Sequence, residues 1–188
     1  MIILTVLILL AIFLAFVFGG IAVYNKLIRL KNSVKSSWSD IDVQLKKRYD
    51  LVPNLVETVK GYAAHERTAF ENVTAARTAA MHASSPADKA KAENMLAGTL
   101  KSLFAVAEAY PELKANTNFL QLQSQLKDLE DDIGYARRYY NAVVRDFNIL
   151  IESFPSNVIA SSFGFKQEDF FELESPGDER KPVKVSFS

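Results

Sequence analysis

The feature that most constrains this chain is an N-terminal run, from Ile2 to Tyr24, without a charged side chain. The run consists almost entirely of Ile, Leu, Val, Phe and Ala, broken by one threonine and one pair of glycines. At a rise of 1.5 Å per residue, a helix of this length spans roughly 34 Å, enough to cross a hydrocarbon core of about 30 Å. Because a helix satisfies its backbone hydrogen bonds internally, we expect residues 1–25 to form a transmembrane anchor.

A cleaved signal peptide is the main alternative for this run. Such a peptide needs a basic start, a shorter apolar core and a small-x-small cleavage site. No Lys or Arg precedes the run, and Gly20 followed by Ala22 imitates a cleavage site poorly. A lipoprotein is excluded because the chain has no cysteine to acylate. The sequence therefore favours a retained anchor.

Basic residues follow the run closely and predict its orientation. Four of them precede the first acidic residue, Asp40: Lys26, Arg29, Lys31 and Lys35. Basic residues near a span are retained in the cytoplasm. We therefore expect a single-pass protein of the cell membrane, with its N-terminus outside and its C-terminal domain in the cytoplasm. The same side chains could also contact anionic lipid headgroups.

Beyond the anchor, apolar residues recur at steps of three or four, which predicts an amphipathic helix that continues from the anchor without a loop. These residues are Leu27, Leu30, Val34, Trp38, Ile41, Leu45, Tyr49, Val52, Val56 and Val59. Pro53 lies inside this stretch, and an interior proline removes a hydrogen bond and kinks or breaks a helix. Gly61 offers a second place to break, and the sequence leaves the choice between the two open.

Two shorter helices are expected next. The first covers roughly residues 64–83 and is rich in alanine. Ser85 then suits a helix N-cap, Pro86 the first helical position, and Asp88 the positive end of the helix dipole. The helix that starts there should end before Pro111.

The longest regular pattern lies near the end of the chain and predicts a helix of roughly 36 residues that stops at Pro155. Its apolar positions alternate steps of three and four over five heptads, as in coiled coils: Phe119, Leu122, Leu126, Leu129, Ile133, Ala136, Tyr140, Val143, Phe147, Leu150 and Phe154. A stripe this long must be buried by the earlier helices. We therefore predict an all-α fold, in which an N-terminal transmembrane helix precedes an elongated antiparallel bundle of three or four helices over residues 26–155.

The last part of the chain, residues 156–188, is expected to be a Phe-rich segment followed by a C-terminal tail. Five phenylalanines lie from Phe154 to Phe171, and the four that follow Phe154 fall outside the regular heptads. They either fold back over the end of the bundle or stay exposed and bind a partner. The alternation from Val183 to Phe187 is typical of a strand.

Seven motifs give the chain a resemblance to the LemA family of bacterial membrane proteins. In order along the chain they are Asp50–Gly61 (DLVPNLVETVKG), Tyr110–Ala115 (YPELKA), Asn118–Gln123 (NFLQLQ), Ala136–Asn141 (ARRYYN), Asp146–Asn148 (DFN), Ser153–Pro155 (SFP) and Phe163–Phe165 (FGF). The resemblance implies a helical bundle in the cytoplasm and an anchor with its N-terminus outside. It implies no activity.

The motif residues that need a structural or interaction role are Pro53, Asn54, Pro111, Asn118, Arg137, Tyr140, Asn141, Phe147, Asn148, Phe154 and Pro155. Asn141 and Asn148 lie seven residues apart beside the seam, where polar groups fix helix register. We favour that role over partner binding for both. The prolines are explained by their positions at helix starts, ends or kinks and need no other role.

The sequence offers little catalytic chemistry. It has no glycine-rich phosphate loop, no cysteine, and two distant histidines, His65 and His82. We therefore expect no catalytic residue, no cofactor and no metal site. The acidic cluster around Asp128 and Asp132 is interpreted as a solvated face.

The chain's 22 basic and 22 acidic residues give a net charge of zero, which argues against nucleic-acid binding. We expect membrane lipid and other membrane or cytoplasmic proteins as partners. Whether the chain also forms homo-oligomers is left open by the sequence. A non-enzymatic scaffold or adaptor is the favoured function. The alternative is a sensor or enzyme domain with an unrecognised small-molecule site.

Overall fold

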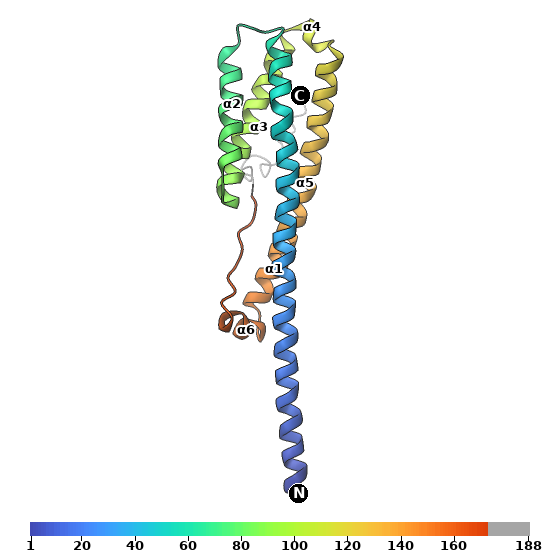
Figure 1. The fold of residues 1–188 in the computed structure, drawn as a ribbon, viewed down its shortest axis with the longest axis vertical. Coiled ribbons are helices and arrows are strands. Elements are labelled where there is room, and N and C mark those ends of the chain that lie inside the picture. Colours follow the sequence, from blue (N-terminus) through green and yellow to red (C-terminus); the bar gives the residue numbers. More distant parts are fainter. Residues whose placement is uncertain (173–188) are drawn as a thin grey trace, which may run out of the picture. The chain divides into compact units, whose positions relative to one another are not determined.

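The computed structural model describes residues 1–172 (Figure 1). Within that range the chain forms six helices: α1 (Ile2–Lys60), α2 (Arg67–His82), α3 (Pro86–Glu108), α4 (Pro111–Lys114), α5 (Thr117–Glu152) and α6 (Ser156–Ser162). The described residues contain no strand. The all-α fold class is therefore confirmed. The strand-like pattern from Val183 to Phe187 lies outside the described residues.

Helix α1 is continuous over 59 residues, so the apolar run and the amphipathic stripe belong to one helix, as expected. Pro53 lies within it, and the helix continues past this residue. It ends at Lys60, one residue before Gly61, whose N–H still donates to the carbonyl of Glu57 at 3.2 Å. Of the two places left open by the sequence, the break therefore falls at Gly61.

The chain divides into two compact units that both use α1 and α5. The first, here called the anchor unit, contains Met1–Ile41 and Ala136–Asp169. The second, the bundle unit, contains Asp42–Tyr135 and the described residues from Phe170 onward. The boundaries expected at residues 25 and 155 remain predictions.

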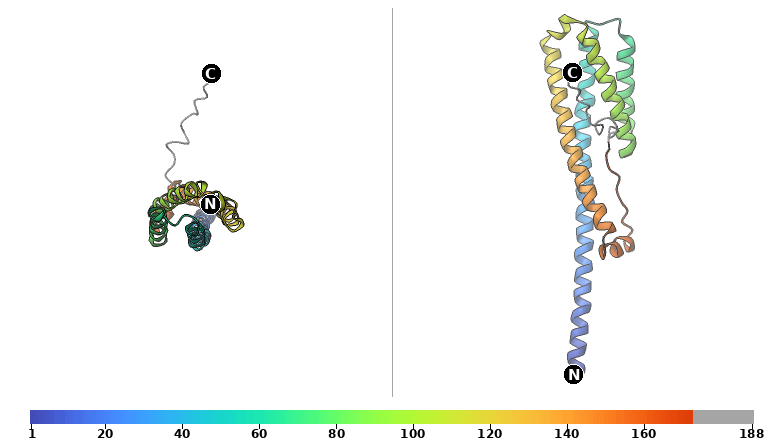
Figure 2. Two further views of the ribbon diagram at one scale, coloured as in Figure 1. Left: turned by 90° about the horizontal axis from the view of Figure 1, so that it is seen from above. Right: turned by 180° about the vertical axis from the view of Figure 1, so that it is seen from behind.

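The bundle unit is built from the end of α1, helices α2, α3 and α4, and the beginning of α5. Helices α2 and α3 lie side by side and antiparallel (Figures 1 and 2). The predicted start of α3 is confirmed: the Asp88 N–H donates to Ser85 Oγ at 3.0 Å, and Pro86 occupies the first helical position. Fully buried aliphatic side chains from α1, α2, α3 and α4 form the core, among them Leu45, Val52, Leu55, Val59, Val73, Leu96, Leu103 and Leu113. Burying each contributes about 1.5–3 kcal/mol.

The anchor unit pairs the first part of α1 with the end of α5. Leu27 and Val34 of α1, and Tyr140, Val144 and Phe147 of α5, are buried. The half-buried Trp38 ring lies 5.2 Å, centroid to centroid, from the Tyr140 ring. Helix α5 has the predicted 36 residues. The predicted seam is wrong at its last position: Phe154 is 84% exposed, because the helix has already ended at Glu152.

After α5 the chain turns through α6 and returns as an extended segment from Phe163 onward. Gly164 adopts a φ of 70°, in the left-handed region that favours glycine, and so lets the chain reverse after α6. Phe165 contacts Phe147 with ring centroids 6.4 Å apart, and Phe171 is fully buried. Part of the Phe-rich segment therefore packs on the protein itself.

Candidate functional site

The most unusual feature of the bundle unit is a charged side chain inside its core. Arg48 occupies the buried stripe of α1, three residues after Leu45 and four before Val52. Only 3% of its side chain is exposed. A buried charge is costly unless it is paired and hydrogen-bonded, so the surroundings of Arg48 determine what the site can do.

Two carboxylates meet this guanidinium. Glu93 of α3, which is also 3% exposed, places Oε2 at 3.2 Å from Arg48 Nη1. Glu130 of α5, which is 44% exposed, places Oε1 at 3.0 Å from Arg48 Nη2. The three side chains connect α1, α3 and α5 through charge-assisted contacts.

Tyr49 extends this cluster. Its hydroxyl donates to the Glu93 carboxylate, and its backbone carbonyl accepts from Arg77 Nε at 2.7 Å. Burial raises the pKa of the Glu93 carboxyl, although the hydrogen bond from Tyr49 and the charge of Arg48 oppose this. Burial also raises the pKa of the Tyr49 hydroxyl, and the adjacent Glu93 raises it further. Both groups therefore hold their protons more tightly than in water.

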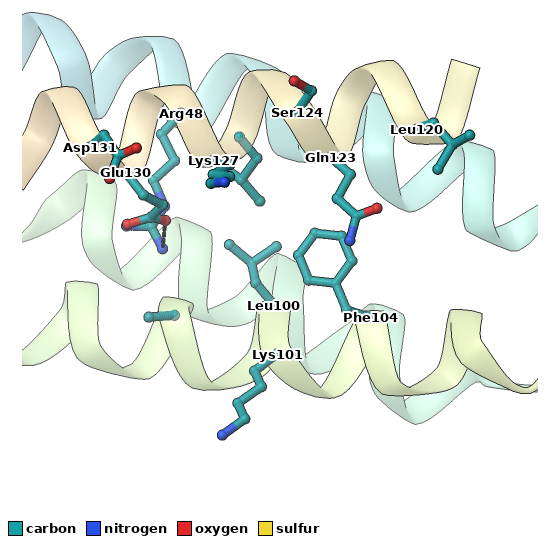
Figure 3. Close-up of a pocket in the computed structure, with 12 residues that line it drawn as sticks. Arg48, Leu100, Lys101, Phe104, Leu120, Gln123, Ser124, Lys127, Glu130 and Asp131 are labelled. Carbon is teal, nitrogen blue, oxygen red and sulfur yellow. Dashed lines mark hydrogen bonds and ion pairs between the residues drawn. The ribbon is translucent and has the colours of Figure 1, made fainter. Parts of the chain in front are cut away.

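A groove of about 710 Å³ opens beside the cluster, between α3 and α5 (Figure 3). Leu100 and Phe104 of α3 point toward α5, and the Arg48–Glu130 pair closes one end. The groove is lined by apolar and charged residues from three helices: Arg48, Ala97, Leu100, Lys101, Phe104, Leu120, Gln123, Ser124, Leu126, Lys127, Glu130 and Asp131. An apolar floor with one charged end is suited to binding an amphipathic partner or ligand.

The groove contains a single hydroxyl, that of Ser124, and no histidine lines it. Among residues 1–172, no group of three or more His, Asp or Glu side chains is placed to hold a metal ion.

The motif residues predicted from sequence are distributed over both units. In the bundle unit, Pro53 and Asn54 lie exposed on α1, Pro111 starts α4, and Asn118 lies exposed near the start of α5. None of these four lines the groove.

In the anchor unit, Arg137 and Asn141 are partly buried on α5, and Phe154 and Pro155 connect α5 to α6.

Three motif residues come together on the face of α5 that holds the returning segment. Asn148 Nδ2 donates to the Glu168 carbonyl at 2.9 Å, and its Oδ1 accepts from the Glu168 N–H at 3.0 Å. The Tyr140 hydroxyl donates to the Asp169 carbonyl at 2.9 Å. Phe147, fully buried between them along the helix, packs on Phe165. These contacts attach the extended segment to α5.

Sequence reasoning missed Arg48 and Glu93, although a signal for them exists. Arg48 falls in the apolar stripe of α1, and Glu93 falls three residues before Leu96 in the stripe of α3. Charges of opposite sign at core positions of two helices indicate a buried ion pair. Glu130 lies within the acidic cluster around Asp128 and Asp132 that the sequence predicts to be a solvated face, and although it is 44% exposed it also pairs with Arg48.

Comparisons with known proteins place these features in a family context. Residues 37–187 match the family model described as LemA family. The magnetosome proteins MamQ 1 and MamQ 2 of Paramagnetospirillum magneticum are each 26% identical over 181 residues, covering 82% of this chain and 66% of their own length. Protein LemA of Metamycoplasma hominis is 27% identical over 140 residues, covering 72% of this chain and 63% of its own length. The chain thus spans about two thirds of the length of the curated relatives it matches.

Proposed function

The chain belongs to the LemA family, and from this membership and its N-terminal helix we propose that it is a single-pass membrane protein that acts as a non-enzymatic scaffold or adaptor. Its helical domain would recruit other proteins at the cytoplasmic face of a bacterial membrane. LemA family membership, the MamQ relatives and the apolar length of α1 all fit a membrane-associated protein.

The observation that carries the proposal is the continuity of α1. An 18-residue window of this helix has a mean hydropathy of 3.1, and none of it is buried. Among the described residues, α1 is the one helix long and apolar enough to cross a membrane. The same helix then supplies Leu45, Val52 and Val59 to the core of the bundle unit. Anchor and binding domain therefore share one uninterrupted element.

Orientation is supported by the flanking charges. Lys26, Arg29 and Lys31 follow the apolar run within seven residues, and no basic side chain precedes it. This bias favours retention of the C-terminal side in the cytoplasm. A reporter fused after Ser188 should be active in the cytoplasm, and a reporter active only outside would contradict the orientation.

A binding role is supported by the groove between α3 and α5. To test it, a photo-crosslinking amino acid is placed at Leu120, an exposed groove residue, in the full chain in native membranes. Lys91, exposed on α3 outside the groove, is the matched control. The proposal expects a discrete protein adduct from Leu120 that is absent from Lys91. Equal adducts from both positions, or none from Leu120, would contradict a scaffold that uses this groove.

A second candidate, a small-molecule sensor, is favoured by one observation. Arg48 lines the groove, and its buried Nε has no hydrogen-bond partner within residues 1–172. A small acidic ligand could satisfy this donor. Native mass spectrometry of the detergent-purified chain should then show a bound small molecule, which Arg48→Met would remove. A chain that is purified without any such mass would favour the scaffold.

A further inference from the structure

Helix α6 lies against the end of the apolar run of α1. A Cβ atom on Gly20 would stand 3.7 Å from Ile159 Cδ1, an ordinary van der Waals distance, so α6 lies directly beside α1 at this residue. The Phe163 ring lies 4.7 Å from the Tyr24 ring, measured between centroids. These four residues line a cavity of about 290 Å³ together with Phe16, Val17 and Ile21.

The position of this contact along α1 sets its depth in a membrane. Gly20 lies four residues before Tyr24, or about 6 Å along the helix axis. The first charge, Lys26, follows two residues after Tyr24. Further along α1, the Lys31 ammonium lies 5.7 Å from the centroid of the Phe165 ring. Helix α6 therefore contacts α1 where the hydrocarbon of a bilayer would give way to headgroups.

Three apolar side chains in and beside α6 are exposed, and one of them, Phe163, also contacts Tyr24 of α1. Phe154 is 84%, Val158 56% and Phe163 64% exposed. The twelve residues from Phe154 to Phe165 include no charged side chain, and the next residue is Lys166. Figure 2 shows this turn at the end of α5. An uncharged aromatic corner beside a membrane span is not explained by packing within the protein.

We propose that residues 154–165, here called the juxtamembrane corner, insert the side chains of Phe154, Val158 and Phe163 into the interfacial layer of the membrane that α1 crosses. This inference rests on the proposed anchor. The occupant is lipid because the exposed corner is continuous, through Gly20 and Tyr24, with the surface of α1 that faces the bilayer. Aromatic and aliphatic side chains prefer this layer, where a lying segment buries its apolar side at the headgroup boundary.

The corner gives the protein a second membrane contact. A single helix leaves a domain free to rotate and tilt about its anchor, whereas a second attachment restricts both. The corner is connected to α5 at both of its ends. It follows α5 directly in the chain, and the segment after it is held on α5 by the hydrogen bonds of Asn148 and Tyr140. The proposed contact would thus fix the orientation of α5 relative to the membrane plane.

The chain lacks cysteine, so single-cysteine variants of the full protein report one position each. Val158→Cys is labelled with an environment-sensitive fluorophore in vesicles of phosphatidylcholine and phosphatidylglycerol. Its quenching by iodide in water is compared with its quenching by lipids that carry a shallow spin label. Ile12→Cys, in the middle of the apolar run, serves as the membrane reference, and Met95→Cys, exposed on α3, serves as the aqueous reference.

The proposal predicts that the label at residue 158 is quenched by the shallow spin-labelled lipid and is several-fold less sensitive to iodide than the label at residue 95. Strong iodide quenching at 158 together with lipid quenching at 12 would overturn the corner and leave the anchor intact. Protection of 158 from both quenchers would show that a protein covers it, a second copy or a partner, and would also overturn the proposal. Absence of lipid quenching at 12 would remove the anchor itself, and the corner with it.

Discussion

Replacing Arg48 by Met should destabilise the bundle unit strongly, because it leaves the Glu93 carboxylate buried without its cation. The two groups are each 3% exposed and 3.2 Å apart. At an effective dielectric constant of about 20, this separation corresponds to about 5 kcal/mol of attraction. Breaking a buried ion pair on one side costs about 3–5 kcal/mol. For a chain of this size the loss corresponds to a fall in Tm on the order of 10 °C.

The cost of Arg48→Met should depend on pH. Burial raises the pKa of Glu93 above its unfolded value, and removing Arg48 removes a charge that lowers it. The folded variant therefore binds a proton at a pH where the unfolded chain does not. Its deficit should be largest at neutral and alkaline pH and should shrink as the pH falls toward the ordinary pKa of a glutamate.

The assay is thermal unfolding of the full chain in detergent, followed by circular dichroism at 222 nm and repeated across the pH range. Arg48→Met with Glu93→Gln should recover most of the lost stability, because the double variant holds no buried unpaired charge. Lys60→Met, which removes the exposed pair with Glu57 at 3.3 Å, is the matched control and should cost less than about 1 kcal/mol. A Tm of Arg48→Met equal to that of the unmodified chain at pH 8 would refute the reasoning.

Three further predictions concern α5. Asn148→Ala should remove two hydrogen bonds to Glu168, which together contribute about 2 kcal/mol. Hydrogen exchange of the Glu168 amide should therefore be about thirtyfold faster in this variant. Asn148→Asp keeps the acceptor for that amide and should increase the exchange rate less. Burial raises the pKa of Tyr140 to about 12. The stability that the neutral Tyr140 hydroxyl contributes should therefore be complete below pH 10 and lost as the pH rises toward 12. In a titration followed by absorbance at 295 nm, Tyr140→Phe should show one late-titrating tyrosine fewer than the unmodified chain. Ile133→Asp buries a charge without a partner and should cost at least about 4 kcal/mol, measured as a collapse of the cooperative unfolding transition; an unchanged transition would contradict the buried seam.

The regular parts of the fold could be predicted from sequence because they depend on local signals. The heptad spacing of α5 predicted a helix of the observed length, and the Ser85–Pro86–Asp88 pattern predicted the start of α3. Pro53 illustrates a limit of such reasoning. Whether a proline breaks a helix depends on how strongly the flanking turns are held, and here Val52, Leu55 and Val56 are all buried around it.

The returning segment could not be predicted, because its attachment is not local. Asn148 binds the backbone of Glu168, twenty residues away, and any residue type could supply that backbone. The register prediction for Asn148 considered the helix alone, whereas the side chain binds an extended segment beside it. The position of α6 likewise depends on a non-local contact, because Ile159 packs beside Gly20, which is far from it in the sequence.

The candidate site was missed for a related reason. A search for apolar residues at helical spacing in α1 and α3 passes over the charged residues that lie in the same stripes, Arg48 and Glu93. Burying either charge alone would cost several kcal/mol of desolvation free energy, and the other charge offsets this cost only when the two are paired. Their pairing becomes apparent when the two helices are considered together.

The central claim is that the apolar run of α1 holds this protein in a bilayer, and alkaline extraction of membranes tests it most directly. The full chain should stay in the membrane pellet at high pH, because a transmembrane helix is not released by loss of surface charge interactions. The same chain without residues 2–24 should move to the soluble fraction and keep a helical circular dichroism spectrum. Release of the full chain into the soluble fraction, or retention of the deleted chain in the pellet, would contradict the claim.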